Sequence, residues 1–384
     1  MIIENISSSR YPLVSIVIPS YKILFFEEAL LSACNQDYPN IEIIITDDRR
    51  SQEIEDVVRK YQNKFNFPIH YFRNEIQLFG EKNFIKGVYE AHGEYVKFLC
   101  DDDILYPTCV SSLCKAMESD NDIVLASSRR RRIDENNNFQ SDGMMAFVYP
   151  FSGDVKLSGS ELINFLTDYT INFIGEPTSI LCRRKMLIEL AENMFRLNDN
   201  FHLHLGDLFL YANLLKQGAF AFLCEPLSAF RTSTEQVSQD GREQENLTIQ
   251  ATEMFSRSIR DLGWYSGDNI STQIITIESL YNKNDVQRAD LIDLFNIAEK
   301  KSAETYALES WLSKRKVPSE QAEILSCYLQ DNSVKIAIFL IHSDEDEDED
   351  NIKKTISSYE KMKSGYESNL KLYYVTDSLH SVKN

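Results

Sequence analysis

The stretch EYVKFLCDDDIL, Glu94–Leu105, leads from an apolar run directly into three consecutive aspartates. The run from Tyr95 to Leu99 is apolar except for Lys97, which is the pattern of a short, buried β-strand. Adjacent carboxylates repel one another, so a fold that gathers them at the end of a strand must supply positive charge nearby. Residues 101–103 therefore mark either a polar turn or a site that binds a cation.

Upstream of this stretch, short apolar runs alternate with segments that have the spacing of amphipathic helices. Repeated strand–helix units with nearly all-apolar strands predict an α/β fold, in which a parallel sheet carries helices on both faces. The expected strands are residues 13–18, 41–45, 69–72 and 95–99, and the expected helices are residues 25–35, 51–61 and 81–91.

Polar residues follow three of these strands, at Pro19–Tyr21, Asp47–Asp48 and Asp101–Asp103. Ligands of parallel α/β sheets bind beyond the carboxyl ends of the strands, so the three groups are expected to line one crevice. Mg²⁺ and Mn²⁺ prefer oxygen ligands, and the second acidic strand end favours a metal site over a solvated turn. A phosphoacceptor receiver domain would need its acidic pair on the first strand, where this chain has Pro-Ser-Tyr.

The composition limits the classes of protein to which the chain can belong. Its 384 residues carry a formal net charge of −19, which argues against binding nucleic acid through a broad basic surface. The amino terminus lacks the pattern of a signal peptide, and no apolar run approaches the roughly 20 residues of a membrane helix. The seven cysteines are scattered, as expected of thiols in a reducing compartment. We therefore expect a cytoplasmic protein, and peripheral association with the inner face of a membrane stays open.

Five motifs in order carry a resemblance to a known family: VSIVIPSYK, IEIIITDDRR, GEYVKFLCDDDIL, GDLFLYANLLKQG and EPLSAFR. Over roughly Tyr11–Gln239 the chain resembles the family-two glycosyltransferases, which have the Rossmann-like GT-A fold. The resemblance implies that a hexosyl or N-acetylhexosaminyl group moves from a nucleotide diphosphate donor, UDP above all, to an acceptor. It also implies inversion at the anomeric carbon and a requirement for Mn²⁺ or Mg²⁺.

The same resemblance assigns residues to the donor. Pro19 and Tyr21 match residues that line the nucleotide pocket, with the Tyr21 ring against the base. Asp48 matches the carboxylate that accepts a hydrogen bond from the uracil imide, and Asn83 matches an asparagine near the donor. A flat ring offers stacking area to a base, and a carboxylate can pair with an imide N–H, so the residue types suit these tasks.

The metal and the base are assigned in the same way. Asp102 matches the metal ligand that faces the donor pyrophosphate, and either Asp101 or Asp103 assists it, because Cys100 stands where the family often has its first aspartate. A metal at this position stabilises the negative charge of a diphosphate leaving group. Asp207 matches the catalytic base, which removes a proton from the acceptor hydroxyl. Its neighbour is Gly206, where a glutamate is common.

Three further features have both a functional and a structural interpretation. Glu176 either hydrogen-bonds a sugar hydroxyl or caps a turn before Pro177. The four arginines at 129–132 either form a solvated strand edge or contact a phosphate-bearing, lipid-linked acceptor. His202 and His204 have no other ligand at metal spacing, so we interpret them as acceptor-cleft or structural residues and not as a zinc site.

The pattern of the chain predicts three parts. Residues 1–239 are expected to form the glycosyltransferase domain, and residues 240–330, which show almost no strand pattern, a helical extension. Residues 331–384 read as a strand, an acidic turn, a helix and a strand, and this order repeats the start of the chain. Two strands and one helix cannot close a core, so we expect the last part to be the start of a second, truncated glycosyltransferase-like unit.

The resulting hypothesis is a metal-dependent, inverting glycosyltransferase of surface polysaccharide or glycoconjugate synthesis, with a saccharide or lipid-linked acceptor. Two other classes of protein are compatible with such a crevice. A nucleotidyltransferase would need a Gly-rich, basic phosphate loop after the first strand, and IPSYKILFF has none. A catalytically silent module that binds sugar nucleotides would keep Tyr21 and Asp48 but would have no use for Asp207.

Overall fold

The computed structural model describes residues 11–140, 149, 151, 153–202, 205–233, 241–267, 271–276, 286–291, 294, 336–342 and 370–376. These residues belong to two compact units, Met1–Phe295 and Asn296–Asn384. The division falls at a different point from the boundaries that we expected after residues 239 and 330.

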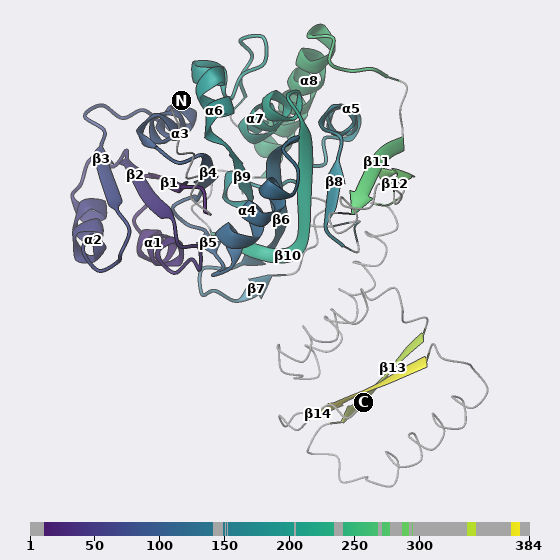
Figure 1. Ribbon diagram of the computed structural model, residues 1–384, viewed down its shortest axis with the longest axis horizontal. Helices are drawn as coiled ribbons and strands as arrows, with labels where there is room; N and C mark the ends of the chain where they lie inside the picture. Colours follow the sequence, from purple (N-terminus) through teal and green to yellow (C-terminus); the bar gives the residue numbers. More distant parts are fainter. Residues whose placement is uncertain are drawn as a thin grey trace, which may run out of the picture. The chain divides into compact units, whose positions relative to one another are not determined.

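The first half of the first unit has the predicted parallel sheet. Its strands lie in the order β3-β2-β1-β4, and each neighbouring pair is parallel. Figure 1 shows them side by side, with β3 at the left. The bounds confirm every predicted strand and helix of this half: β1 Val14–Ser20, α1 Phe26–Cys34, β2 Ile41–Asp47, α2 Glu53–Tyr61, β3 Ile69–Arg73, α3 Gly80–Glu90 and β4 Tyr95–Phe98.

Helices cover both faces of this sheet, as predicted. Val14, Ile16 and Ile18 on one face of β1 belong to a core that includes apolar residues of α1, α2 and α4 (Cys109–Ser119). Val17 points to the other face, where α3 packs closely. A Cβ atom on Gly87 of α3 would lie 2.3 Å from Val17 Cγ1, so only glycine allows this approach.

The second half of the first unit extends the sheet with mixed strand directions. β9 is antiparallel to both β4 and β6, so it lies between them, and β10 is parallel to β6. The sheet is therefore entirely parallel only in its first half, whereas the second half mixes parallel and antiparallel pairs. The elements are β5 Ile104–Leu105, β6 Ile123–Ile133, β7 Phe139–Gln140, β8 Val155–Leu157, α5 Gly159–Tyr169, η2 Pro177–Ser179, β9 Ile180–Arg183, α6 Arg184–Leu190, η3 Ala191–Asn193, α7 Gly206–Leu215 and β10 Ala219–Arg231.

The stretch after residue 240 begins with the expected helix, α8 (Gly241–Asp261), but it is not entirely helical. β11 (Ser271–Thr276) pairs with β8, and β12 (Val286–Asp290) pairs with β11, both antiparallel. Our expectation of helices alone was wrong. β11 forms its pairs with the edge strand β8, which lies more than a hundred residues earlier in the chain. A pairing between such distant segments cannot be predicted from the local sequence pattern.

The second unit contains two of the elements predicted for the end of the chain. β13 (Ile336–His342) and β14 (Leu370–Thr376) form a parallel pair over their whole length, from Ile336 opposite Leu370 to His342 opposite Thr376. Parallel strands require a crossover connection. The helix that we predicted in that connection lies outside the described residues.

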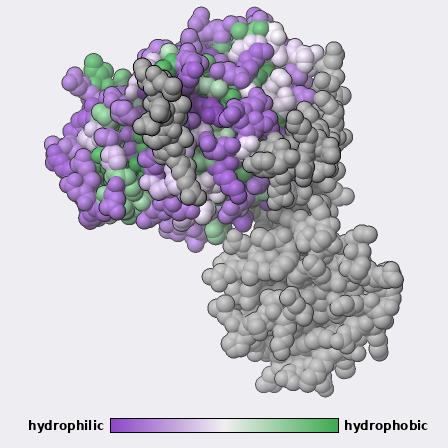
Figure 2. All heavy atoms as spheres, in the orientation of Figure 1, coloured by the Kyte–Doolittle hydropathy of each residue, from purple (hydrophilic) through white to green (hydrophobic). Residues whose placement is uncertain are grey.

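Within the described ranges, none of the helices combines the length and the apolar character needed to cross a bilayer. Figure 2 shows hydrophilic residues over most of the described surface that faces the viewer, with smaller hydrophobic areas among them.

Candidate active site

The ends of β1 and β2 and the loop after β4 meet, as their positions in a parallel sheet predicted. The backbone N–H groups of Tyr21 and Lys22 donate to Asp101 Oδ2 over 2.7 and 2.6 Å. The N–H of Asp48 donates to the carbonyl of Ser20 over 2.8 Å. Asp101 therefore ties the loop of Asp101–Asp103 (the aspartate loop) to the end of β1. The three polar strand ends lie together, and the region beyond them is where we expect the crevice.

Asp102 and Asp103 have different surroundings within this loop. Asp102 Oδ2 lies 2.9 Å from the ammonium of Lys22. Asp103 is buried, and both of its oxygens accept hydrogen bonds, Oδ1 from the Arg231 N–H over 2.9 Å and Oδ2 from the Thr178 hydroxyl over 2.5 Å. Burial raises the pKa of Asp103 well above its usual range, and the neighbouring Asp102 charge raises it further.

The fit of these residues to a divalent cation depends on Asp102. No cluster of three or more His, Cys, Asp or Glu side chains suited to a metal occurs among the described residues. Mg²⁺ in nucleotide sites is commonly held by only one or two carboxylates and takes its other ligands from substrate phosphates and water. Asp102 fits that arrangement. Asp103 already holds Thr178 and Arg231 inside the fold, so its predicted role as a metal ligand stays a prediction.

The buried guanidinium of Arg231 connects the aspartate loop to α1. The side chain is 0% exposed, and its Nε donates to the carbonyl of Asp102 over 2.8 Å. Its Nη2 lies 2.9 Å from Glu28 Oε2 on α1, and the guanidinium lies 4.1 Å from the centre of the Phe25 ring. Lys22 and Arg231 thus supply much of the positive charge that three adjacent aspartates require.

The predicted donor residues lie along the rim of the crevice. Tyr21 is 53% exposed, and Pro19 lies in β1 beside Thr46 of β2. Asp48 accepts hydrogen bonds from the N–H groups of Leu78 and Phe79, both over 2.7 Å. In this structure Asp48 therefore anchors the loop before α3, and its contact with a base stays a prediction.

Asn83 also has a structural role. It is buried, its side-chain NH₂ donates to the carbonyl of Thr46 over 3.0 Å, and its Oδ1 accepts from Asn74 over 2.9 Å. Asn74 donates from the same NH₂ group to Asp48 over 2.8 Å. Asn74 thus joins two predicted donor residues, and no motif in the sequence had indicated it.

Asp207 lies in the first turn of α7, at the position that the sequence predicted. Its Oδ1 accepts the N–H of Leu208 over 2.9 Å, and its Oδ2 accepts from the Asn172 side chain over 2.6 Å. Burial raises the pKa of this carboxyl to about 7. The Glu176 carboxylate also raises it, whereas Asn172 and the guanidinium of Arg130 lower it.

Glu176 pairs with Arg130 and does not cap the turn. Arg130 Nε lies 2.5 Å from Glu176 Oε2, and Arg130 Nη2 lies 3.2 Å from Oε1. Glu176 makes no side-chain capping bond to the turn that follows it, so our capping alternative was wrong. The solvated-edge interpretation of the four arginines was also wrong, because β6 lies inside the sheet and Arg130 is 2% exposed.

One segment, residues 172–179, connects Asp207 with the aspartate loop. Asn172 at its start holds Asp207, and Thr178 near its end holds Asp103. Gly175 between them has φ +104°, and a Cβ atom there would lie 2.4 Å from Ser179 Oγ. The position therefore requires glycine. The sequence pointed to Glu176 in this segment but to neither Asn172 nor Thr178.

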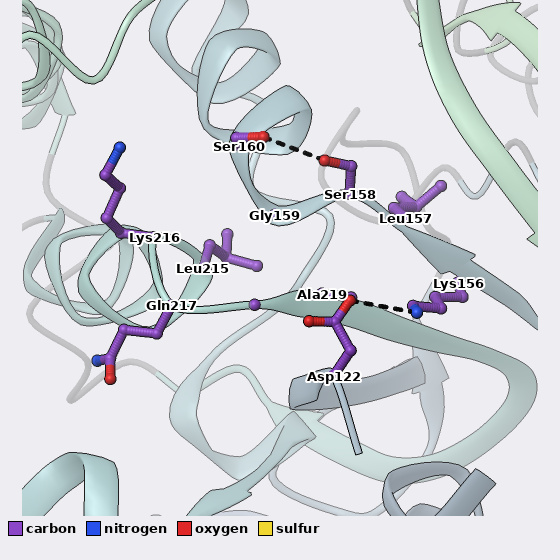
Figure 3. Close-up of a pocket in the computed structure, with 11 residues that line it drawn as sticks. Asp122, Lys156, Leu157, Ser158, Gly159, Ser160, Leu215, Lys216, Gln217 and Ala219 are labelled. Carbon is purple, nitrogen blue, oxygen red and sulfur yellow. Dashed lines mark hydrogen bonds and ion pairs between the residues drawn. The ribbon is translucent and has the colours of Figure 1, made fainter. Parts of the chain in front are cut away.

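A cavity of about 360 Å³ lies elsewhere in the first unit (Figure 3). It is lined by residues such as Gly159 at the start of α5 and Ala219 at the start of β10, and Lys156 at its wall pairs with Asp120 and Asp122. The amino ends of β6 and β10 form this edge of the sheet, which is opposite to the edge with the aspartates. Of the two predicted histidines, His204 lies outside the described residues.

Residues 15–191 match the family described as Glycosyl transferase family 2. The abequosyltransferase RfbV of Salmonella typhimurium is 34% identical over 125 residues, which cover 32% of this chain and 38% of that protein. The GalNAc(5)-diNAcBac-PP-undecaprenol beta-1,3-glucosyltransferase of Campylobacter jejuni is 30% identical over 211 residues, which cover 54% of this chain and 62% of that protein. The chain thus spans less than two thirds of either relative.

Among solved structures, TarS of S. aureus in complex with UDP-GlcNAc has a TM-score of 0.46 and 18% sequence identity. The match covers 63% of this chain and 66% of that one.

Proposed function

We propose that this chain is a family 2 glycosyltransferase with a GT-A fold, because residues 15–191 match the model of that family. In this proposal it uses a nucleoside diphosphate sugar, with UDP as the nucleotide. The acceptor is a hydroxyl of a saccharide or of a lipid-linked saccharide, and the reaction inverts the anomeric carbon. The observation that carries this proposal is the way in which the polar strand ends are joined. One short segment ties the carboxylate of Asp207 to the aspartate loop beside the exposed ring of Tyr21.

The donor occupies the side of the crevice formed by β1 and β2. The exposed Tyr21 ring offers a stacking face to the base, with Pro19 beside it, and Asp48 and Asn83 hold the loop that borders the base. Asp102 is the residue that would hold Mn²⁺ or Mg²⁺ against the diphosphate, while Asp101 keeps the loop in position. When bound, the cation stabilises the negative charge of the departing diphosphate.

Asp207 acts on the acceptor. A pKa of about 7 leaves a large fraction of this carboxyl ionised near neutral pH, where a general base is most effective. Asp207 takes the proton of the acceptor hydroxyl while the acceptor oxygen bonds to the anomeric carbon. The bond from that carbon to the diphosphate oxygen breaks on the opposite face, which inverts the configuration. Glu176, which Arg130 orients, also raises the pKa of Asp207, and we assign it to a sugar hydroxyl on the same side.

One finding supports the class of acceptor. The Campylobacter relative is named as a glucosyltransferase acting on an undecaprenol diphosphate-linked saccharide. We therefore place this chain in surface polysaccharide or glycoconjugate synthesis, in the cytoplasm, where a lipid-linked acceptor is reached at the inner face of the membrane.

The test of this function is a screen of donors by thermal unfolding. At a UDP-sugar concentration about a hundredfold above Kd, with Mn²⁺, binding is expected to raise the Tm by roughly 5–10 °C. Measured transfer and donor hydrolysis then separate a transferase from a silent binding module. No Tm shift with any UDP-, GDP-, CDP- or dTDP-sugar would contradict the proposal.

The role of Asp102 has its own expected result. Asp102→Asn should remove the gain in UDP affinity that Mn²⁺ gives, because the amide has lost the anionic ligand, while the fold stays intact because Arg231 binds the backbone carbonyl. Calorimetry of UDP with Mn²⁺ and with EDTA measures this gain. Asp103→Asn is the matched comparison, and there we expect a lower Tm, since both oxygens of Asp103 hold the fold. An unchanged Mn²⁺-dependent gain in Asp102→Asn would rule out this role.

A further inference from the structure

Lys22 follows Tyr21 at the end of β1 and extends its ammonium to the carboxylate of Asp102, 2.9 Å away. Its side chain is 30% exposed, so the ammonium lies at the open side of the crevice. Arg231, on the other side of the same loop, is fully buried and hydrogen-bonded to the Asp102 carbonyl, to Asn137 and to Glu28. Of these two cations at the aspartates, Lys22 alone is positioned to meet a ligand.

The pair that Lys22 makes with Asp102 is an exchangeable contact. Partly exposed ion pairs contribute little stability, so a stronger partner can take over either group at low cost. Lysine is a compact charge on a flexible stem and is a common phosphate ligand. Asp102, in turn, is the carboxylate that fits a divalent cation. Each member of the pair therefore has a stronger partner in a nucleotide complex.

We propose that Lys22 is a diphosphate ligand that competes with the divalent cation for Asp102. Before the donor binds, Lys22 neutralises Asp102. When a nucleoside diphosphate enters, the ammonium moves to a phosphate oxygen and leaves the carboxylate to the cation. This inference rests on the proposed function, because it assumes that the crevice receives a nucleoside diphosphate.

The competition predicts opposite effects of one substitution on two ligands. Lys22→Gln removes the charge that binds phosphate, so UDP affinity in EDTA should fall about tenfold or more, the usual effect of losing one charge-assisted hydrogen bond. The same substitution frees Asp102, so the affinity for Mn²⁺ alone should rise. A purely structural ion pair predicts no fall in UDP affinity in EDTA.

The experiment measures UDP and uridine binding in EDTA by calorimetry, and Mn²⁺ binding without nucleotide by electron paramagnetic resonance. Lys22→Gln is compared with the wild type, with Lys22→Arg, which keeps the charge, and with Lys185→Gln. Lys185 is 87% exposed on α6 and controls for the loss of one positive charge. We expect unchanged uridine affinity in all four proteins, a weaker UDP complex only in Lys22→Gln, and substantial recovery in Lys22→Arg.

The outcomes distinguish this inference from the proposed function. Equal UDP affinity of Lys22→Gln and the wild type in EDTA overturns the role of Lys22, and so does Mn²⁺ affinity that fails to rise. UDP binding to the wild type that is detectable with Mn²⁺ but absent in EDTA overturns it as well. If the wild type binds none of UDP, GDP, CDP and dTDP even with Mn²⁺, the proposed function itself fails, and this inference fails with it.

Discussion

Asp207→Asn is expected to lower the turnover number about a hundredfold or more and, at the same time, to make the protein more stable above pH 7. The amide keeps the shape of the carboxyl, and its one oxygen can accept the hydrogen bond from either Leu208 or Asn172, as a protonated carboxyl would, but it cannot take a proton from the acceptor. Donor affinity should stay near its wild-type value, because neither the proposed metal ligand nor the proposed nucleotide contacts involve Asp207.

The gain in stability follows from the raised pKa. The usual value of an Asp carboxyl is 3.8, and burial raises the pKa of Asp207 to about 7. The folded state therefore holds this proton more tightly than the unfolded state, so the contribution of the group is fully present below about pH 4 and is lost as the pH rises to about 7. Asparagine carries no charge to desolvate, so the Tm of the variant should exceed that of the wild type by a few degrees at pH 8 and match it near pH 4.

Two measurements check these expectations together. The kcat/KM of the wild type should rise with pH to a plateau above about pH 7, whereas the residual activity of Asp207→Asn should lack that rise. Asp168→Asn on α5 is a suitable control, since Asp168 contacts Arg260 and Tyr265 and lies outside the crevice. A near wild-type rate for Asp207→Asn would show that Asp207 only stabilises the first turn of α7. Another residue would then have to be the base.

Arg231→Met is expected to cause the largest loss of stability, about 3 kcal/mol or more, which corresponds to a Tm lower by roughly 6–10 °C. The methionine fills part of the space of the arginine but leaves the buried acceptors of that guanidinium without donors. The clearest case is the carbonyl of Asp102, 2.8 Å from Arg231 Nε. The aspartate loop also loses its attachment to α1, so UDP affinity with Mn²⁺ should fall.

Glu28→Gln provides the matched comparison for Arg231. Glu28 is the exposed end of the ion pair, and the amide can still accept the Nη2 hydrogen bond, so we expect a change below about 1 kcal/mol. Arg231→Lys should resemble Arg231→Met, because a single ammonium cannot reach acceptors in several directions. Chemical unfolding curves measure all three. If Arg231→Lys were as stable as the wild type, the positive charge, and not the several N–H donors of the guanidinium, would explain the stabilising effect of Arg231.

The sequence predicts the first half of the fold well because its information there is local. Strands such as Ile41–Asp47 are short runs rich in isoleucine that are buried on both faces, and the helices between them have regular spacing, so each element can be recognised alone. The mixed half depends on pairings between distant strands. Nothing within ILCR shows that β9 inserts between β4 and β6 in the opposite direction, or that β11 completes the edge of β8.

The same distinction applies to the candidate site. The sequence indicated Asp102 and Asp207, because each is an aspartate beside the end of a strand or helix that can be recognised from the sequence alone. The ion pairs of the site were not predicted, since Arg130 and Glu176 are 46 residues apart and Arg231 and Glu28 are 203 apart. Each member alone has the appearance of an ordinary surface charge. Lys97 is similar: it interrupts an apolar strand, yet it is fully buried and donates to the carbonyls of Phe98 and Thr178.

The segment 172–179 joins the two sides of the candidate site. Asp207 is hydrogen-bonded to Asn172 at its start, and Asp103 is hydrogen-bonded to Thr178 near its end. If donor and acceptor bind as proposed and favour different arrangements of this segment, each alters the affinity of the other by the same factor, because linkage is reciprocal. We therefore expect any cooperativity between the two ligands to change when this segment is altered, for example at Gly175.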